Sequence, residues 1–329
     1  LGCVDYLSFG SECGDLVALT EVARILAEDG PALNAHIRAG MEKGWSYPRA
    51  RAYAAGAVAG AARGAAGGKA AGSDISRILA EPNDILGAEY LRRLITVGSA
   101  IEPVAVKRFA CAEDGIDAGA GVAGGTALRS LLAAGEDISA YLPEATRDVI
   151  SEYEARGVTP VKQETLLQLL LYRIATSGPE ELAQVFSATE GLENRLIAAA
   201  NRASSLQEAI RYTKTRRYTE TRVKRLIAHT VVGLTKADMA AAEAAGVYAR
   251  VLAFGEGGAR LLRRARKTAR IPVITNPNKQ IGKTGQDAPD LTPVARFDRR
   301  AAALYRILQT GALAGYDDTK IFPKQFTSL

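Results

Sequence analysis

Histidine and cysteine are scarce in this sequence of 329 residues, and their scarcity excludes several kinds of site. His36 and His229 are the only histidines, too few for a histidine-rich metal site. Cys3, Cys13 and Cys111 are scattered and form no Cys-x-x-Cys pair, a usage typical of reduced thiols in a cytosol. We therefore predict a cytoplasmic protein without a metal site of its own.

The sequence also lacks a long apolar run and a visible secretory signal. No stretch approaches the ~20 uninterrupted apolar residues of a membrane-spanning helix, so no membrane partner is expected. Hydrophobic residues make up 47% and charged residues 24%, a balance typical of a soluble globular protein. The net charge of +6 permits a polyanionic partner, and nothing in the composition implies a protein partner.

The first residues have the pattern of a strand from the interior of a sheet. The chain begins at Leu1 instead of methionine, and apolar, β-prone residues run from Val4 to Phe9. A polar loop follows, and then a helix is predicted from about Leu16 to Ala27. We therefore expect a fragment that lacks the first strands of its sheet and exposes an edge at its first strand.

Alternation of strand and helix signals over residues 1–143 predicts an α/β domain with a parallel sheet. A helix over 85–97 leads into a second strand over 103–109. Ligands of open parallel sheets bind beyond the carboxyl ends of the strands. There Gly10 would let the backbone approach a nucleotide, and Arg108 could hold a phosphate. A plain strand-to-helix turn and a surface arginine are the alternatives.

Two later segments could bind an anion at a helix start. In the first, Pro82 suits a first helical turn, and Asn83 and Asp84 are residues that cap helices. Free N–H groups there would suit a nucleotide or a phosphate, and an ordinary capped helix is the alternative. In the second, a glycine-rich loop over 119–125 precedes Thr126 and Arg129, which could form an anion cradle.

From about residue 138 the strand pattern disappears, and successive helices are predicted from 3.6-residue periodicity. The run from Arg211 to Arg225 reads RYTKTRRYTETRVKR, with seven basic residues against one acid. Its spacing places several basic residues on one helical face beside a tyrosine, so looped or single-stranded RNA is a reasonable partner. A solvated face is the alternative, with Arg260–Arg270 as the next candidate surface. The candidate RNA contacts are Lys214, Arg216, Arg217, Tyr218, Arg222 and Arg225.

These patterns divide the chain into three parts: an α/β domain over 1–143, a helical region over 144–245 and a small α/β appendage over 246–329. In the appendage, strands are expected over 247–254 and 271–275, with a basic helix over 258–269 between them. A last helix is expected over 298–310.

A set of short motifs keeps a fixed order over nearly the whole chain. They are Phe9-Gly10-Ser11-Glu12 with Gly14-Asp15, Gly44-x-Ser46-Tyr47-Pro48, Pro82-Asn83-Asp84-Ile85-Leu86-Gly87, Lys107-Arg108, Thr126-x-x-Arg129, Glu190-Gly191-Leu192-Glu193-Asn194-Arg195 and Lys214-Thr215-Arg216-Arg217-Tyr218-Thr219-x-Thr221-Arg222. Each is weak alone, and together they resemble the bacterial tRNA(Met) cytidine acetate ligase family.

The resemblance implies a partial Rossmann-like nucleotidyltransferase domain, its first strands missing, followed by a mainly α-helical tRNA-binding region. It implies an ATP-dependent enzyme that activates acetate as acetyl-adenylate. The acetyl group would then pass to N4 of the wobble cytidine of elongator tRNA(Met), giving N4-acetylcytidine. Gly10, Asn83 and Arg108 match family residues that contact ATP, and Mg²⁺ is expected only because it travels with ATP.

The family's opening Asn-Pro-Phe-His-x-Gly-His motif is not found in this sequence, so the catalytic residues are unknown and activity of this chain alone is not assured. Two alternatives stay open. One is another adenylyl-transferring enzyme of the same fold, which would have little use for the basic helical half. The other is a non-catalytic RNA-binding protein, for which the missing histidine motif and the Gly124-Gly125 pair before Thr126 would be the signature.

Overall fold

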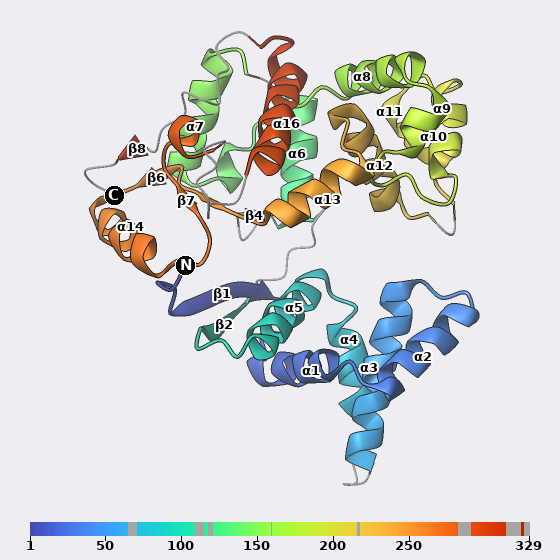
Figure 1. Cartoon of the computed structure of the whole chain (residues 1–329), viewed down its shortest axis with the longest axis vertical. Coiled ribbons are helices and arrows are strands. Elements are labelled where there is room, and N and C mark those ends of the chain that lie inside the picture. Colours follow the sequence, from blue (N-terminus) through green and yellow to red (C-terminus); the bar gives the residue numbers. More distant parts are fainter. Residues whose placement is uncertain are drawn as a thin grey trace. The chain divides into compact units, whose positions relative to one another are not determined.

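The computed structural model of this chain describes residues 1–64, 71–108, 115–117, 121–158, 160–215, 218–281, 291–313 and 324–325. The chain forms two compact units (Figure 1). One contains Val4–Ala134, and the other contains Leu1–Cys3 with Gly135–Leu329. The division into three domains expected from the sequence stays a prediction.

The first unit contains two parallel strands with helices packed against them, which confirms the predicted α/β class (Figure 1). Its principal elements are β1 (Tyr6–Ser11), β2 (Glu102–Lys107), α1 (Leu16–Glu28) and α5 (Pro82–Thr96). The register places Gly10 opposite Val106 and Ser11 opposite Lys107. The carboxyl ends of both strands therefore meet at one edge.

The core of this unit lies where α1 and α5 pack on β1. Asp15 caps α1 by accepting hydrogen bonds from two backbone N–H groups of its first turn. Leu19, Val22 and Leu26 then line one buried face of the helix, as their spacing predicts. Burying each such side chain contributes roughly 1.5–3 kcal/mol.

Further elements complete the first unit. They are α2 (Pro31–Glu42), α3 (Tyr47–Gly64), α4 (Ala71–Ile78), the antiparallel pair β3 (Ile116–Asp117) and β4 (Val122–Ala123), and α6 (Gly125–Ala134). In α3, Ala50, Ala54 and Ala55 are fully buried. Small side chains allow neighbouring helices to approach closely, which is why this alanine-rich segment can pack as a helix.

The second unit begins with a succession of helices, as the 3.6-residue periodicity predicts. They are α7 (Glu144–Ala155), α8 (Gln163–Thr176), α9 (Pro179–Ala183), α10 (Leu192–Ala200), α11 (Leu206–Thr213), α12 (Glu220–Val232) and α13 (Lys236–Ala245), after the short 3-10 helix η1 (Ser139–Tyr141). Leu170, Leu192 and Leu226 are at most 1% exposed and mark the core between α8, α10 and α12.

The remainder of the second unit combines short strands with helices. Its elements are β5 (Ala249–Arg250), β6 (Ala253–Phe254), α14 (Glu256–Thr268), β7 (Val273–Ile274), α15 (Pro277–Gln280), α16 (Thr292–Thr310) and β8 (Lys324–Gln325). The single strand predicted over 247–254 is wrong. β5 pairs with β7 whereas β6 pairs with β8, so the chain changes partner between them.

No helix in the described ranges is both long and apolar enough to cross a membrane.

Gly87 and Gly60 provide a matched test of the packing between α5 and β1. A Cβ at Gly87 would lie 2.6 Å from Phe9 Cε2, whereas a Cβ at Gly60 of α3 would meet nothing within 4 Å. Alanine favours a helix interior, so Gly60→Ala should raise the free energy of unfolding by about 0.5–1 kcal/mol. Gly87→Ala should instead lower it by about 1–3 kcal/mol because the Phe9 ring must move. Urea denaturation of both variants tests this, and equal shifts would contradict the described packing.

Candidate functional site

The loop that follows β1 is tied to the start of α5 by the carboxylate of Glu12. The Asn83 side-chain amide donates to Glu12 Oε1 at 2.5 Å, and the backbone N–H of Asp84 donates to Glu12 Oε2 at 3.0 Å. Both donors belong to the first turn of α5, where the helix dipole favours a negative charge. Glu12 therefore caps a helix that lies far along the chain.

Asp84, in the first turn of α5, accepts hydrogen bonds from the loop that follows β1. Only 1% of the residue is exposed, and its carboxylate accepts hydrogen bonds from the Ser11 hydroxyl and, at 3.0 Å, from the backbone N–H of Cys13. The Ser11 hydroxyl in turn accepts from the backbone N–H of Gly14 at 2.8 Å. Because these buried polar groups satisfy one another, the shape of the loop depends on α5.

These contacts correct the expectation that the N–H groups at the start of α5 are free for a phosphate. The helix start already faces the carboxylate of Glu12, and a phosphate there would meet a like charge. Asp84 also does not cap α5, because its side chain is turned toward Ser11 and Cys13. Sequence reasoning gave Glu12 and Ser11 no role, although both lie in the first family motif.

Hydrogen bonding also sets the ionisation of Glu12. Burial alone would raise its pKa, but donation from the Asn83 side chain and from nearby backbone N–H groups outweighs burial and lowers the pKa below the ordinary value of 4.5. Glu12 is therefore charged at neutral pH, as its capping role requires.

Gly10 and Arg108 lie together at the carboxyl edge of the parallel strands, which confirms their predicted placement. The Arg108 backbone N–H donates to Ser11 O at 2.9 Å and so extends the hydrogen bonding between β1 and β2 by one bond. A Cβ at Gly10 would lie 3.5 Å from Arg108 Cγ, so the arginine side chain passes beside the glycine. Arg108 is exposed, and no carboxylate in the described ranges pairs with it. Its guanidinium is available to a phosphate.

Asn83 lies beside the same loop, and its orientation limits what it can bind. Its amide nitrogen donates to Glu12, so the group left for a ligand is the side-chain carbonyl oxygen, which is an acceptor. An acceptor suits a hydroxyl or an amine, such as those of a ribose or an adenine, and repels a phosphate oxygen.

Thr126 and Arg129, the predicted anion cradle, contact each other on α6. Arg129 Nη2 donates to Thr126 Oγ1 at 3.3 Å, and both residues are exposed. Within the described part of the chain no hydrogen bond joins this pair to Gly10, Asn83 or Arg108. Their cradle role stays a prediction.

The basic run over 211–225 is not one helix, so the predicted single helical face is wrong. α11 ends at Thr213 and α12 begins at Glu220. Between them the Thr215 hydroxyl accepts from the Tyr218 backbone N–H at 3.1 Å, and Thr215 N–H donates to Tyr218 O at 3.3 Å. These two hydrogen bonds join Thr215 to Tyr218 directly, and neither residue is helical. Arg216 and Arg217 lie outside the described residues.

Tyr218 belongs to the helical core, which corrects its predicted role as a base-stacking residue. Only 6% of the residue is exposed, and its hydroxyl donates to the backbone carbonyl of Glu190 at 3.1 Å. The Arg222 guanidinium lies 4.9 Å from the ring centroid. A nucleobase therefore has no open ring face to stack on.

Arg222 holds the segment at Thr189 and Glu190, which Tyr218 also contacts, and is a positioning residue. It donates to the Thr189 hydroxyl and lies 3.6 Å from the Glu190 carboxylate. Glu190 has a φ of 58° and Gly191 a φ of 75°. The left-handed conformation is unfavourable for glutamate, so contacts from Tyr218 and Arg222 stabilise a strained segment.

Lys214 and Arg225 direct their charges toward solvent. Lys214 Nζ lies 3.6 Å from Glu220, whose carboxylate also pairs with Lys224 at 2.7 Å. Exposed pairs of this kind are weak, so a phosphate could compete for the cations. Arg225 is exposed and pairs with no carboxylate among the residues described.

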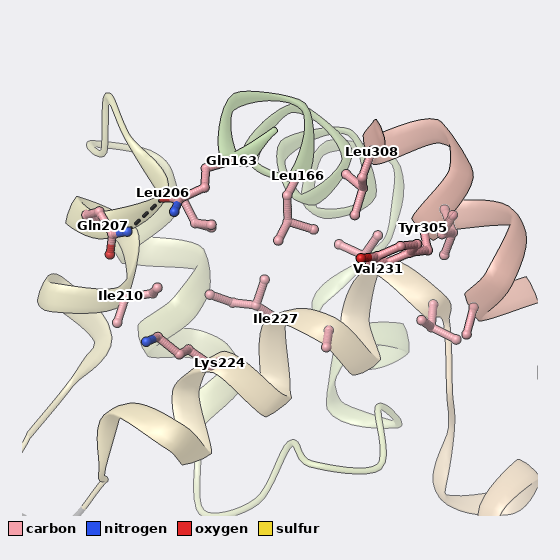
Figure 2. Close-up of a pocket in the computed structure, with 14 residues that line it drawn as sticks. Gln163, Leu166, Leu206, Gln207, Ile210, Lys224, Ile227, Val231, Tyr305 and Leu308 are labelled. Atoms are coloured by element: carbon pink, nitrogen blue, oxygen red, sulfur yellow. Dashed lines mark hydrogen bonds between the residues drawn. The ribbon is translucent and has the colours of Figure 1, made fainter. Parts of the chain in front are cut away.

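A cavity of about 410 Å³ lies between α8, α11, α12 and α16 (Figure 2). Aliphatic side chains line most of it, and at one end Gln207 donates to Gln163 at 2.7 Å, with Lys224 nearby (Figure 2). None of the predicted site residues lines it. Apolar walls cannot satisfy a triphosphate, so the cavity does not suit ATP.

The described residues contain no group of three His, Cys, Asp or Glu side chains arranged to hold a metal. The carboxylates nearest Gly10, those of Glu12 and Asp84, already accept hydrogen bonds from the protein.

Comparison with known proteins identifies related chains. A family model described as HIGH nucleotidyl transferase matches residues 1–318. The tRNA(Met) cytidine acetate ligase of Thermosipho africanus is 32% identical over 279 residues, which are 84% of this chain and 64% of that protein. The ligase of Thermoanaerobacter sp. strain X514 is 28% identical over 320 residues, 96% of this chain and 75% of that protein.

A solved structure is also similar. The crystal structure of Thermotoga maritima TmcAL bound with alpha-thio ATP matches with a TM-score of 0.84 and 26% identity, over 99% of this chain and 77% of that chain. The present chain thus spans roughly two thirds to three quarters of the relatives it matches.

Glu12→Gln tests the tie between β1 and α5. Since the pKa of Glu12 is lowered in the folded protein, its charge stabilises the fold above the unfolded value of 4.5 and stops doing so as pH falls through the folded pKa. The variant should therefore be less stable than wild type at pH 7, and the difference should shrink below pH 4.5. Urea denaturation across this pH range measures it. A difference that is constant with pH would show that the charge of Glu12 plays no part.

Proposed function

Because this chain belongs to the HIGH nucleotidyl transferase family, we propose that it acts in ATP-dependent acetylation of the wobble cytidine of elongator tRNA(Met). The observation that carries the proposal is that the Arg108 side chain lies beside Gly10 at the carboxyl edge of a parallel sheet. The same fold occurs in a relative whose structure contains an ATP analogue.

The first step is the activation of acetate. An acetate oxygen attacks the α-phosphorus of ATP, the bond to the β-phosphate breaks, and pyrophosphate leaves with acetyl-adenylate remaining. Negative charge accumulates on the phosphates, so a fixed cation and close backbone approach are the main requirements. Arg108 supplies the cation, and Gly10 leaves room for the approach. Asn83 Oδ1 accepts a hydrogen bond from the ribose or the adenine.

The second step is the transfer of the acetyl group to RNA. The N4 amine of the cytidine attacks the acetyl carbonyl carbon, the amine loses a proton, and AMP leaves. The base must be unpaired for its amine to reach the adenylate, as an anticodon loop allows. Lys214 and Arg225 hold RNA phosphates, joined by Arg216 and Arg217, while Tyr218 and Arg222 hold the segment at Thr189 and Glu190 against α12.

Acetate is the proposed acyl donor, Mg²⁺ arrives with ATP, and the protein works in the cytoplasm. Cys3 and Cys13 are free thiols, which is consistent with a reducing compartment.

Arg108→Gln tests the ATP site. Removing one charge-assisted hydrogen bond should cost about 1.5–3 kcal/mol, or roughly 10- to 150-fold in acetyl-adenylate formation. Acetate-dependent exchange of pyrophosphate into ATP measures this step, and tRNA affinity should be unchanged. Arg156→Gln, which removes an exposed arginine at the C-cap of α7, is the matched control. Equal exchange rates in both variants would place the phosphate site elsewhere.

A double variant, Lys214→Gln with Arg225→Gln, tests the RNA surface. Each phosphate that is no longer neutralised should reduce the salt dependence of tRNA binding by about 0.7 in the log–log slope, with weaker affinity. Titration of tRNA at several salt concentrations gives both values. Arg211→Gln is the control, because that guanidinium pairs with Glu208 at 3.1 Å. If the double variant keeps the wild-type slope, these residues are only solvated charges.

A further inference from the structure

A row of positive charges lies along one side of α14. Successive residues of an α-helix are about 100° apart, so Arg260, Arg263, Arg264 and Lys267 fall within an arc of about 100°. All four are exposed, and we call them the α14 basic face. The opposite side of the helix carries Ala265, its buried residue.

Carboxylates in the described part of the chain form no ion pair with the α14 basic face. The only acid on the helix is Glu256, in its first turn. Like charges three and four residues apart repel one another, so this arrangement destabilises the free helix. A polyanion lying along the face would remove that repulsion.

The composition of α14 limits the kind of polyanion. The helix reads EGGARLLRRARKT and contains no aromatic residue, so it cannot stack on unpaired bases. Arginine guanidinium groups instead match phosphate oxygens. The apolar side of the helix faces the protein in part: Ala265 is buried, and a Cβ on Gly258 would lie 2.8 Å from Phe254 Cβ, whereas Leu261 is 53% exposed. One exposed leucine offers little apolar area for insertion, so a membrane surface suits the helix less well.

We propose that the α14 basic face binds the phosphate backbone of a double-helical RNA stem, without reading its sequence. From Arg260 to Lys267 the face extends about 10 Å along a rigid helix, which lets it contact several phosphates of a regular backbone at once. Base edges of double-stranded RNA are poorly accessible, so such stems are bound through shape and phosphates. The inference rests on the proposed function only in taking tRNA as the natural source of the stem.

The test compares Arg263→Gln/Arg264→Gln with Arg147→Gln/Arg156→Gln, a control that removes two exposed arginines, one in α7 and one at its C-cap. Glutamine keeps the helix propensity close to that of arginine, so both variants should fold. Binding is measured over a series of salt concentrations for elongator tRNA(Met), a non-substrate tRNA, an RNA duplex of about 16 base pairs and anionic phosphatidylglycerol vesicles.

The α14 variant should bind all three RNAs several-fold more weakly, and its salt slope should fall by about 0.9 for each phosphate that is no longer neutralised, as for duplex DNA. The control should match wild type. Unchanged duplex binding, a weakening confined to tRNA(Met), or α14-dependent binding of vesicles without RNA would each overturn the inference. If the wild-type protein binds the duplex through α14 but does not acetylate tRNA, the proposed function is refuted and the inference about α14 stands.

Discussion

The exchange of hydrogen bonds between the loop after β1 and the first turn of α5 is the interaction on which the candidate ATP site depends. Glu12 accepts from the start of α5, while Asp84 of that helix accepts from the loop. Removing either carboxylate leaves donors of the other segment unpaired in a partly buried place. Because both are satisfied, the edge that carries Gly10 and Arg108 has one defined geometry.

In the second unit, too, polar side chains of one segment hold a segment that is distant in sequence. Tyr218 and Arg222 look like RNA-binding residues in the sequence, yet both contact the strained segment at Glu190. Lys214 and Arg225 are instead exposed on the surface of the same unit.

Positive charge in the second unit occurs in two structural settings. The run over 211–225 is divided between the end of α11 and the start of α12, whereas the α14 basic face is a continuous helix surface without aromatic residues. A straight helix suits a regular stem. Two such surfaces would let one protein hold a folded RNA at more than one place, so that affinity and choice of base need not come from the same residues.

Hydrophobic periodicity and motif order were enough to determine the α/β class, the succession of helices, the placement of Gly10 beside Arg108 and the family, which the match over residues 1–318 confirms. Periodicity reports local burial, and the motifs record residue types. Neither says which polar groups pair across the fold. Contacts between residues distant in sequence decided these pairings. Glu12 accepts a hydrogen bond from the start of α5, Asp84 accepts one from Ser11, and Tyr218 is buried with its hydroxyl on the Glu190 carbonyl. Only the tertiary structure could decide these points, because a polar side chain's role depends on the partner that folding brings to it.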